Sequence, residues 1–152
     1  MKFIELNLEV ILKLLDLLKE DNIPKWGTMT PIMMVEHLTT MLKMSNGKYH
    51  PAKAKDFNNT ERPSDFLNSA IPLQKNLKAS FIPEFVEVKN DSLPDAIDEF
   101  TEEWIAYEEH YHDDSDTREV HPYFGLLNHD QWQKLHRKHI SHHLLQFGLI
   151  TS

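Results

Sequence analysis

Apolar residues recur at helical spacing in four stretches of the chain, and polar residues fill the positions between them. This pattern predicts four amphipathic helices, which we expect, caps included, at about 4–19, 30–47, 92–111 and 128–148. The first stretch, MKFIELNLEVILKLLDLLKED, is interrupted by Glu, Asp and Lys throughout. It therefore predicts an amphipathic helix and lacks the unbroken apolar core of a signal peptide.

Residues with capping chemistry stand where three of these helices should begin. Thr30 precedes the second helix, Ser92 the third and Asn128 the fourth. Their side-chain oxygens can accept a hydrogen bond from a backbone N–H that has no partner within the helix. Asp95 and Gln131, each three residues further on, have the spacing of a capping box. These signals predict the starts of the helices more sharply than periodicity alone.

Two long connections separate the helices. The segment 48–90 is interrupted repeatedly by proline, and a short helix within SDFLNSAIPLQKNLKASF is the regular element we expect there. A second loop, HDDSDTREVHPYFGLL, is aromatic and polar, and no stretch of the chain has a convincing strand pattern. We therefore predict an all-α fold, a four-helix bundle with one long crossover connection, forming a single domain over residues 1–152.

Composition narrows the classes of function. A formal net charge of −8 disfavours general attraction to nucleic acid or to an anionic membrane, so we expect neither partner. No apolar stretch is long enough to span a bilayer, and a cytoplasmic location is the default expectation. The sequence contains no Cys, which excludes disulfides, thiolate ligands and a thiol nucleophile supplied by the protein.

Four of the ten histidines fall within eight residues, in HRKHISHH. At about 100° per residue, His143 lies about 40° from His139 around the fourth helix, on the face that carries Trp132 and is expected to pack inward. Two histidines at this spacing can bind one ion. His136 lies near the same face, whereas residues such as Ser141 point the opposite way. The alternative is that protonated histidines near a helix C-terminus interact with its dipole.

A third ligand should come from another helix. His37, in MMVEHLTTML, lies one turn from both Met34 and Met41 and is therefore on an apolar face. A buried histidine with apolar neighbours needs a partner, and a metal ion would supply one. The alternative is a histidine that is hydrogen-bonded within the core.

Two segments together resemble a known family. HPYFGLLNHDQWQKLHRKHISHHLLQFGL, residues 121–149, is similar to the C-terminal signature of the DinB-like superfamily, in particular of its DUF1569 branch. WGTMTPIMMVEHL, residues 26–38, resembles the start of that family's second helix. The resemblance implies a four-helix bundle with one long crossover, and a divalent metal ion held by His37, His139 and His143. Relatives in the superfamily include metal-dependent thiol transferases and a thiol-dependent isomerase.

These observations lead to a hypothesis about function. Three histidines leave a divalent ion with open positions, which is typical of catalytic sites, and zinc or nickel are the metals we expect first, with iron and copper as alternatives. We expect a thiol-transferase-like enzyme that joins an external low-molecular-weight thiol to a small electrophilic substrate. A hydrolase that uses a metal-bound water and a non-catalytic, metal-stabilised bundle are the alternatives, and a homodimer stays open beside a monomer.

Further residues are candidates for roles near the metal. His142, His136 and His121 are the catalytic candidates, since histidine titrates near neutral pH and can move protons. Each has a structural alternative: a hydrogen bond to a neighbouring helix or loop for His142, a solvated position for His136 and a turn before Pro122 for His121. An anionic substrate would need a nearby positive charge, and Arg118 is the residue that we expect to supply it.

Overall fold

The protein is mostly helical in the computed structural model, which describes residues 2–50, 63–76, 87–114 and 116–152. The predicted crossover, residues 48–90, is described only in part, because residues 51–62 and 77–86 lie outside the described residues. The elements follow in the order α1 (Leu8–Leu15), α2 (Pro31–Ser45), α3 (Pro63–Asn68), α4 (Leu93–His112), β1 (Glu119–His121), β2 (Gly125–Leu127) and α5 (His129–Gln146).

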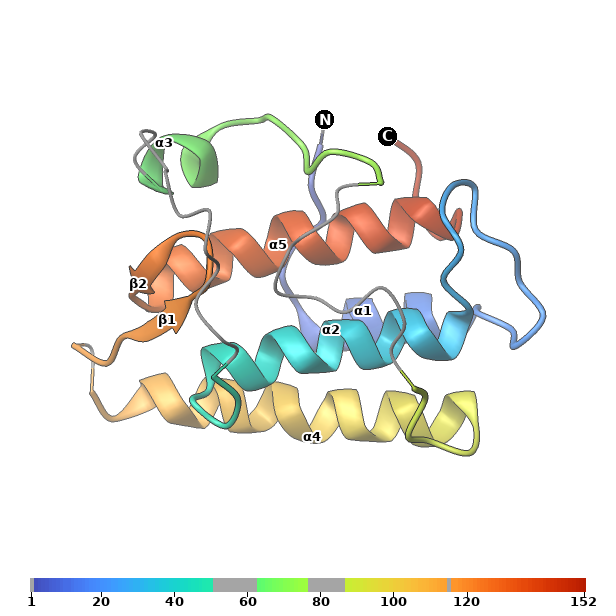
Figure 1. Ribbon diagram of the computed structural model, residues 1–152, viewed down its shortest axis with the longest axis horizontal. Coiled ribbons are helices and arrows are strands. Elements are labelled where there is room, and N and C mark those ends of the chain that lie inside the picture. The colour runs from blue at the N-terminus through green and yellow to red at the C-terminus, as the bar shows by residue number, and fades with distance from the viewer. Residues whose placement is uncertain (1, 51–62, 77–86, 115) are drawn as a thin grey trace.

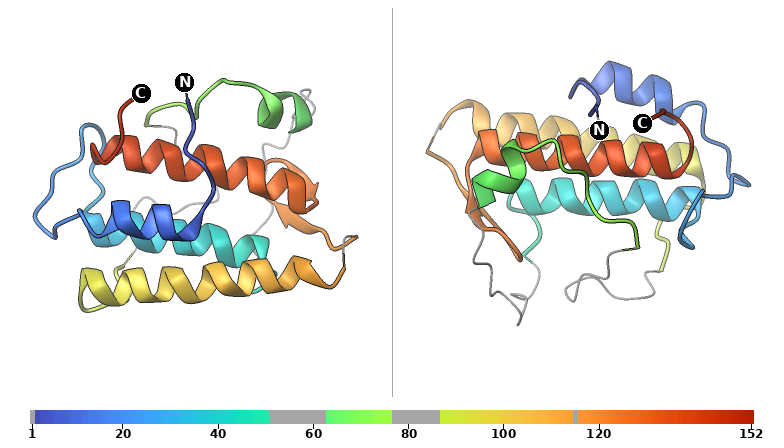
Figure 2. Two further views of the ribbon diagram at one scale, coloured as in Figure 1. Left: turned by 180° about the vertical axis from the view of Figure 1, so that it is seen from behind. Right: turned by 90° about the horizontal axis from the view of Figure 1, so that it is seen from above.

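The long helices α2, α4 and α5 run side by side (Figure 1). Helix α2 contacts both α4 and α5, while α1 packs against α4 and the short helix α3 contacts α5. Views from behind and from above show the N-terminal segment crossing α5 before the chain enters α1 (Figure 2). Within the described part of the chain, no helix combines the length and the apolar character that crossing a membrane requires.

The helices begin where the capping residues predict. The hydroxyl of Thr30 accepts from the N–H of Met33 at 3.2 Å, and that of Ser92 from the N–H of Asp95 at 3.2 Å. At the start of α5 the capping box is complete, since Asn128 and Gln131 each accept from the other's backbone N–H at 2.9 Å. These three predicted helix starts are confirmed.

Helix α1 is shorter than its hydrophobic pattern predicts. Asn7 caps it, with Oδ1 3.1 Å from the N–H of Val10, and the helix ends at Leu15. The residues before it are used elsewhere, because the N–H of Ile4 donates to Ser141 Oγ of α5 at 3.0 Å. After Leu15 the chain continues in tight turns with hydrogen bonds to residues three positions back.

The prediction that the chain has no strand is wrong. Residues Glu119–His121 and Gly125–Leu127 pair as an antiparallel hairpin, with His121 opposite Gly125. Each strand has three residues, of which the last is buried and the middle one exposed. A strand this short contains too few alternating positions to be recognised in the sequence. Gly125 adopts a φ of 76°, a conformation that favours glycine, where the chain enters β2.

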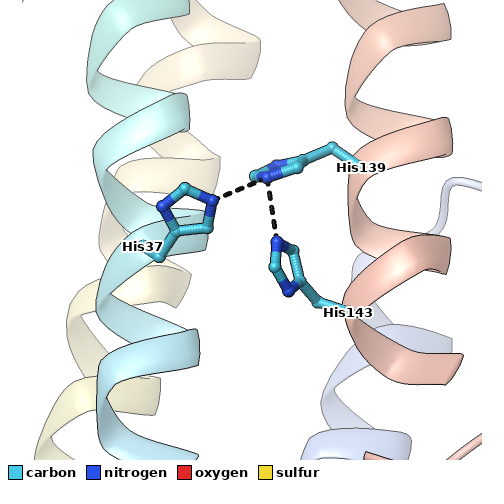
Figure 3. A group of neighbouring side chains, drawn as sticks. All are labelled: His37, His139 and His143. Carbon is cyan, nitrogen blue, oxygen red and sulfur yellow. Dashed lines mark hydrogen bonds between the residues drawn. The ribbon is translucent and has the colours of Figure 1, made fainter. Parts of the chain in front are cut away.

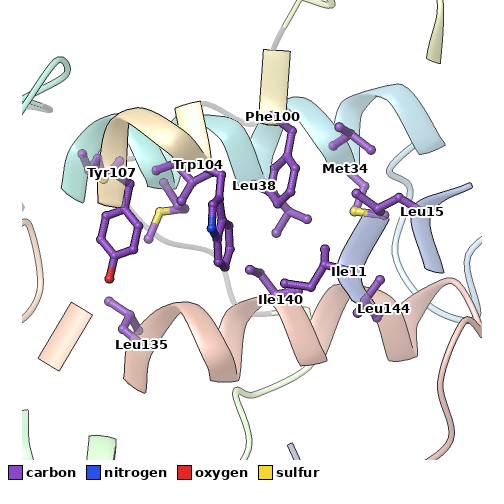
Figure 4. Close-up of a cluster of buried hydrophobic side chains, with 14 of the residues drawn as sticks. Ile11, Leu15, Met34, Leu38, Phe100, Trp104, Tyr107, Leu135, Ile140 and Leu144 are labelled. Carbon is purple, nitrogen blue, oxygen red and sulfur yellow. The ribbon is translucent and has the colours of Figure 1, made fainter. Parts of the chain in front are cut away.

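The hydrophobic core lies between α2, α4 and α5, and α1 closes one side of it (Figure 4). Trp104 and Phe100 of α4 are almost completely buried, as are Leu38 of α2 and Ile140 of α5. Side chains of this size remove enough apolar surface from water to dominate the stability of a domain this small. The packing holds α2 and α5 in a fixed relative position, and both carry candidate ligands.

The side of α5 that faces away from the predicted ligands is buried in part: Arg137 is exposed, as the helical wheel predicts, whereas Ser141, which the wheel also places outward, is not. Ser141 is fully buried under the N-terminal segment, and Lys138 is 1% exposed. The ammonium group of Lys138 donates to the carbonyl oxygens of Ser69 and Ile71 and lies over the rings of Phe3 and Phe66. These contacts cover α5 on the face that its sequence suggests should meet solvent.

Candidate metal centre

Three histidine side chains converge at the contact between α2 and α5 (Figure 3). Nε2 of His139 lies 2.8 Å from Nε2 of His37 and 3.1 Å from Nε2 of His143. One ring nitrogen from each residue falls within 4.8 Å of the other two, so the three could hold a metal ion. His139 and His143 are buried, and His37 is partly buried.

The two helices produce this arrangement by simple geometry. His139 and His143 are one turn apart on α5, so their rings stand above one another on the same face. His37 comes from the middle of α2, between the buried residues Met34 and Met41. The core packing of α2 against α5 therefore brings together ligands that are 102 positions apart in the sequence.

The orientation of the His143 ring is fixed by two hydrogen bonds in series. The side-chain nitrogen of Gln146 donates to the carbonyl oxygen of Trp26 at 3.0 Å, and a carbonyl can only accept. The amide oxygen of Gln146 therefore faces Nδ1 of His143, at 2.7 Å, and Nδ1 must carry the proton. This leaves the lone pair of His143 on Nε2, the atom that points into the centre.

Close packing also holds Gln146 in place. Gly27 follows Trp26 and has a φ of 77°, and a Cβ at this position would lie 3.1 Å from the Gln146 side-chain nitrogen. The backbone N–H of Lys25 donates to the carbonyl oxygen of Gln146 at 2.7 Å. The turn before α2 thus clamps the residue that orients His143, a function for residues 25–27 that the sequence pattern does not reveal.

Burial keeps all three imidazoles neutral. Burial, with a smaller contribution from the charge of His142, lowers the pKa of His37 from 6.5 to about 4. Burial and repulsion between the neighbouring rings lower the pKa of His139 and His143 well below the usual value. Because a metal must compete with protons for its ligands, a site whose histidines are already deprotonated at neutral pH is prepared for metal binding.

The donor set suits a divalent metal ion. Two nitrogens bound to one tetrahedral zinc at the usual bond length lie about 3.4 Å apart, so the 2.8 and 3.1 Å separations need to open by roughly half an ångström.

Nδ1 of His139 is buried without a hydrogen-bond partner among the described residues. The ring orientation of His143 is therefore fixed by its hydrogen bond with Gln146, whereas the ring of His139 is oriented by packing.

His142 lies beside the centre. Its ring meets that of His143 edge-on at 5.0 Å between centroids and that of Trp26 at 5.4 Å. Burial lowers its pKa, and a backbone hydrogen bond with Leu73 opposes the shift. His142 is thus the one of the three catalytic candidates whose ring contacts a candidate ligand, and it also makes the loop contact that was its structural alternative.

His136 and His121 lie together in a separate buried cluster. His136 Nε2 is 2.8 Å from Ser45 Oγ, and its ring stacks on Trp132. Nδ1 of His121 accepts from the N–H groups of Tyr123 and Phe124, which organises the turn of the hairpin. The structure does not bring either residue into the group of three, and His136 is not solvated.

Other residues considered from the sequence occupy different places. Arg118 is exposed and directly precedes β1, beside the N-terminal end of α5. His139, the candidate ligand nearer to that end, is 10 positions after the first residue of α5, so about 15 Å of helix separates it from the N-terminal end. The position of Arg118 therefore does not support the expectation that it provides charge next to the metal ligands.

No protein-family model, curated protein or solved structure matches this chain. The resemblance to the DinB-like superfamily thus remains a prediction that rests on the motifs themselves. The grouping of His37, His139 and His143 stands independently of it, because it follows from the positions of the side chains.

Replacing each ligand separately should remove the metal. We expect His37→Ala, His139→Ala and His143→Ala to lack the divalent ion that wild-type protein retains when purified without a His tag. His136→Ala should keep the ion but lose about 2–4 kcal/mol of stability, because it leaves a cavity and removes the hydrogen bond to Ser45, whose hydroxyl keeps only its bond to the Leu42 carbonyl oxygen. Elemental analysis and urea denaturation measure the two effects. Metal loss from His136→Ala with retention in His143→Ala would contradict the assignment.

The hydrogen bond to Gln146 should contribute to metal affinity. Gln146→Leu removes the acceptor for the His143 N–H, and we expect the zinc dissociation constant to rise about 10- to 100-fold. Gln146→Glu retains an acceptor and should recover most of the affinity. Competition with a chromophoric chelator measures both constants. Equal affinities for wild type and Gln146→Leu would show that the side chain has no part in ligand orientation.

Metal-free protein should lose stability as the pH falls below about 6.5. Burial lowers the pKa of both His121 and His136 to about 3 in the folded protein, whereas an unfolded chain titrates near 6.5. Between these values the unfolded chain binds more protons, so the free energy of unfolding falls as pH falls, by at most about 1.4 kcal/mol per pH unit for each residue. Urea denaturation near pH 7, 6 and 5 measures the slope. His136→Gln should show a shallower slope, and an unchanged one would refute the contribution of His136.

Proposed function

We propose that the protein is a metal-dependent enzyme of the thiol-transferase type, which joins an external low-molecular-weight thiol to a small electrophile. The proposed framework is a four-helix bundle of the DinB-like kind, with one long crossover. The observation that carries the proposal is the convergence of three neutral imidazoles, with their Nε2 atoms turned toward one another. A structural zinc usually has four protein ligands, and the group in the described part of the chain has three.

The residues of the centre match what a catalytic metal requires. His37, His139 and His143 would hold one divalent ion, for which zinc or nickel are the leading candidates. Such an ion would lower the pKa of a bound thiol or water and so favour its nucleophilic form near neutral pH. The relay from Trp26 through Gln146 keeps the lone pair of His143 directed at this position.

The thiol has to come from outside the protein. The chain contains no Cys, so a sulfur nucleophile can only arrive as a cosubstrate. In the reaction that we propose, the thiol S–H bond breaks and an S–C bond forms. The electron pair displaced at the carbon departs with a leaving group or, in an activated C=C bond such as that of N-ethylmaleimide, moves to the neighbouring carbon, which takes up a proton. His142 is placed to accept the thiol proton, since its ring lies 5.0 Å from that of His143 and burial, which lowers its pKa, keeps it neutral near pH 7.

His121 and His136 take no part in this proposal. Both ring systems are committed to structural contacts, His121 with the hairpin turn and His136 with Ser45 and Trp132. We assign them to the packing of the hairpin and α4 against the N-terminal half of α5.

The test is conjugation of several small thiols to N-ethylmaleimide by metal-loaded protein. We expect wild type to accelerate the reaction and His139→Ala to fall to the uncatalysed rate, because it lacks the metal. His142→Ala should retain the metal but react about 100-fold more slowly, the usual size of a lost proton-transfer group. His50→Ala, at an exposed position, is the control and should match wild type.

The results separate the alternatives. Equal rates for metal-loaded wild type and His139→Ala with every thiol would eliminate the transferase. Cleavage of an ester by the same metal-loaded protein without any thiol would instead establish a hydrolase. If removal of the metal lowers the stability of the protein and changes the rate of neither reaction, the centre has only a structural role, in which it joins α2 to α5.

A further inference from the structure

A lysine lies on the face of a tryptophan that is linked to the metal centre through His142. Nζ of Lys75 is 4.4 Å from the ring centroid of Trp26, a cation–π contact. Trp26 in turn contacts the ring of His142, which contacts that of the ligand His143. The three steps, of 4.4, 5.4 and 5.0 Å, limit the distance between Lys75 Nζ and the His143 ring to about 15 Å.

The backbone around Lys75 is held in place. Leu73 makes a backbone hydrogen bond with His142, which joins this segment to α5. Asn76 adopts a φ of 57°, a left-handed conformation that asparagine tolerates, and its Oδ1 would lie 3.6 Å from a Cβ at Gly27. The turn that carries Lys75 is thus attached both to the helix of the ligands and to the turn before α2. The position of its positive charge is set by the fold.

The charge of Lys75 has no carboxylate partner among the residues that the structure describes, where the lysine ion pairs involve residues 13, 43, 48 and 134. Lys75 is also exposed, so a solute can reach it. The chain has a net charge of −8, and Lys75 is linked to the candidate centre through Trp26 and His142. A positive charge so placed attracts anions that the rest of the surface repels.

We propose that a molecule bound at the metal centre carries an anionic group, a carboxylate in the simplest case, that pairs with Lys75 beside Trp26. This inference rests on the proposed function and adds to it the chemical class of the substrate. Lys75 Nζ and the His143 ring are at most about 15 Å apart, a distance within the span of a small peptide or of a long-chain acid. Lys75 is a binding residue in this proposal and takes no part in the chemical step.

The pairing is tested with pairs of thiols that differ only in charge. Zinc-loaded protein is titrated with 6-mercaptohexanoate and with 6-mercaptohexanol, and with the longer pair 11-mercaptoundecanoate and 11-mercaptoundecanol, so that the chain can span a separation of up to about 15 Å. Binding is followed by calorimetry. In wild type we expect the carboxylate to bind about three- to fivefold more tightly, the strength of an exposed ion pair. The preference should vanish in Lys75→Met and persist in Lys75→Arg. It should also weaken with added salt, because exposed charges are screened.

Arg118→Met is the matched control, since it removes one exposed positive charge from the opposite end of α5. It should keep the preference of wild type. A second arm compares N-ethylmaleimide with 3-maleimidopropionate, using neutral 2-mercaptoethanol as the thiol. A dependence on Lys75 in the first arm places the anionic group on the thiol, and a dependence in the second places it on the electrophile.

The two hypotheses fail in different ways. If the thiols bind and neither arm depends on Lys75, the inference is overturned while the metal-dependent function stands. If no thiol binds, the thiol-transferase proposal fails. Hexanoate and hexanol then replace the thiols in the same titration. The inference is overturned as well if wild type binds the two equally or binds neither, and Lys75→Met behaves in the same way.

Discussion

Three uncharged imidazole rings meeting at the contact between α2 and α5 are the feature on which the rest of the site depends. Protonation of these rings would place like charges about 3 Å apart in a buried position, which is strongly unfavourable. The fold maintains the neutral state by burying the rings against one another, and the hydrogen bond to Gln146 determines which nitrogen of His143 carries the proton. The turn at Trp26 holds Gln146, and residue Leu73 makes a backbone hydrogen bond with His142 beside the rings.

Local patterns in the sequence were sufficient to locate the main helices and the three converging histidines. Thr30, Ser92 and Asn128 cap helices in the way that their side chains predict. His139 and His143 could be paired because helical spacing alone puts them on one face. His37 required only the assumption that an apolar face of α2 packs inward. Each of these predictions depends on residues within a few positions of one another.

The features that were missed depend on contacts between distant segments. The wheel placed Ser141 toward solvent, yet residues from the N-terminus and from the end of α3 cover that side of α5. Similarly, Lys75 and Trp26 come from separate loops, and nothing in either local sequence indicates that they meet. The hairpin was missed for a different reason, because strands of three residues have almost no periodicity to detect.

The separation of 102 positions between His37 and His139 has a consequence for the order of folding. A contact between such distant segments carries a large loop-closure entropy and forms late compared with the turns of a single helix. The chain must form α5, which follows all the other elements, before His37 can meet His139 and His143. Metal binding by all three histidines would therefore require the complete tertiary structure. An intermediate in which α5 has not yet packed against α2 would offer an ion only the pair His139 and His143.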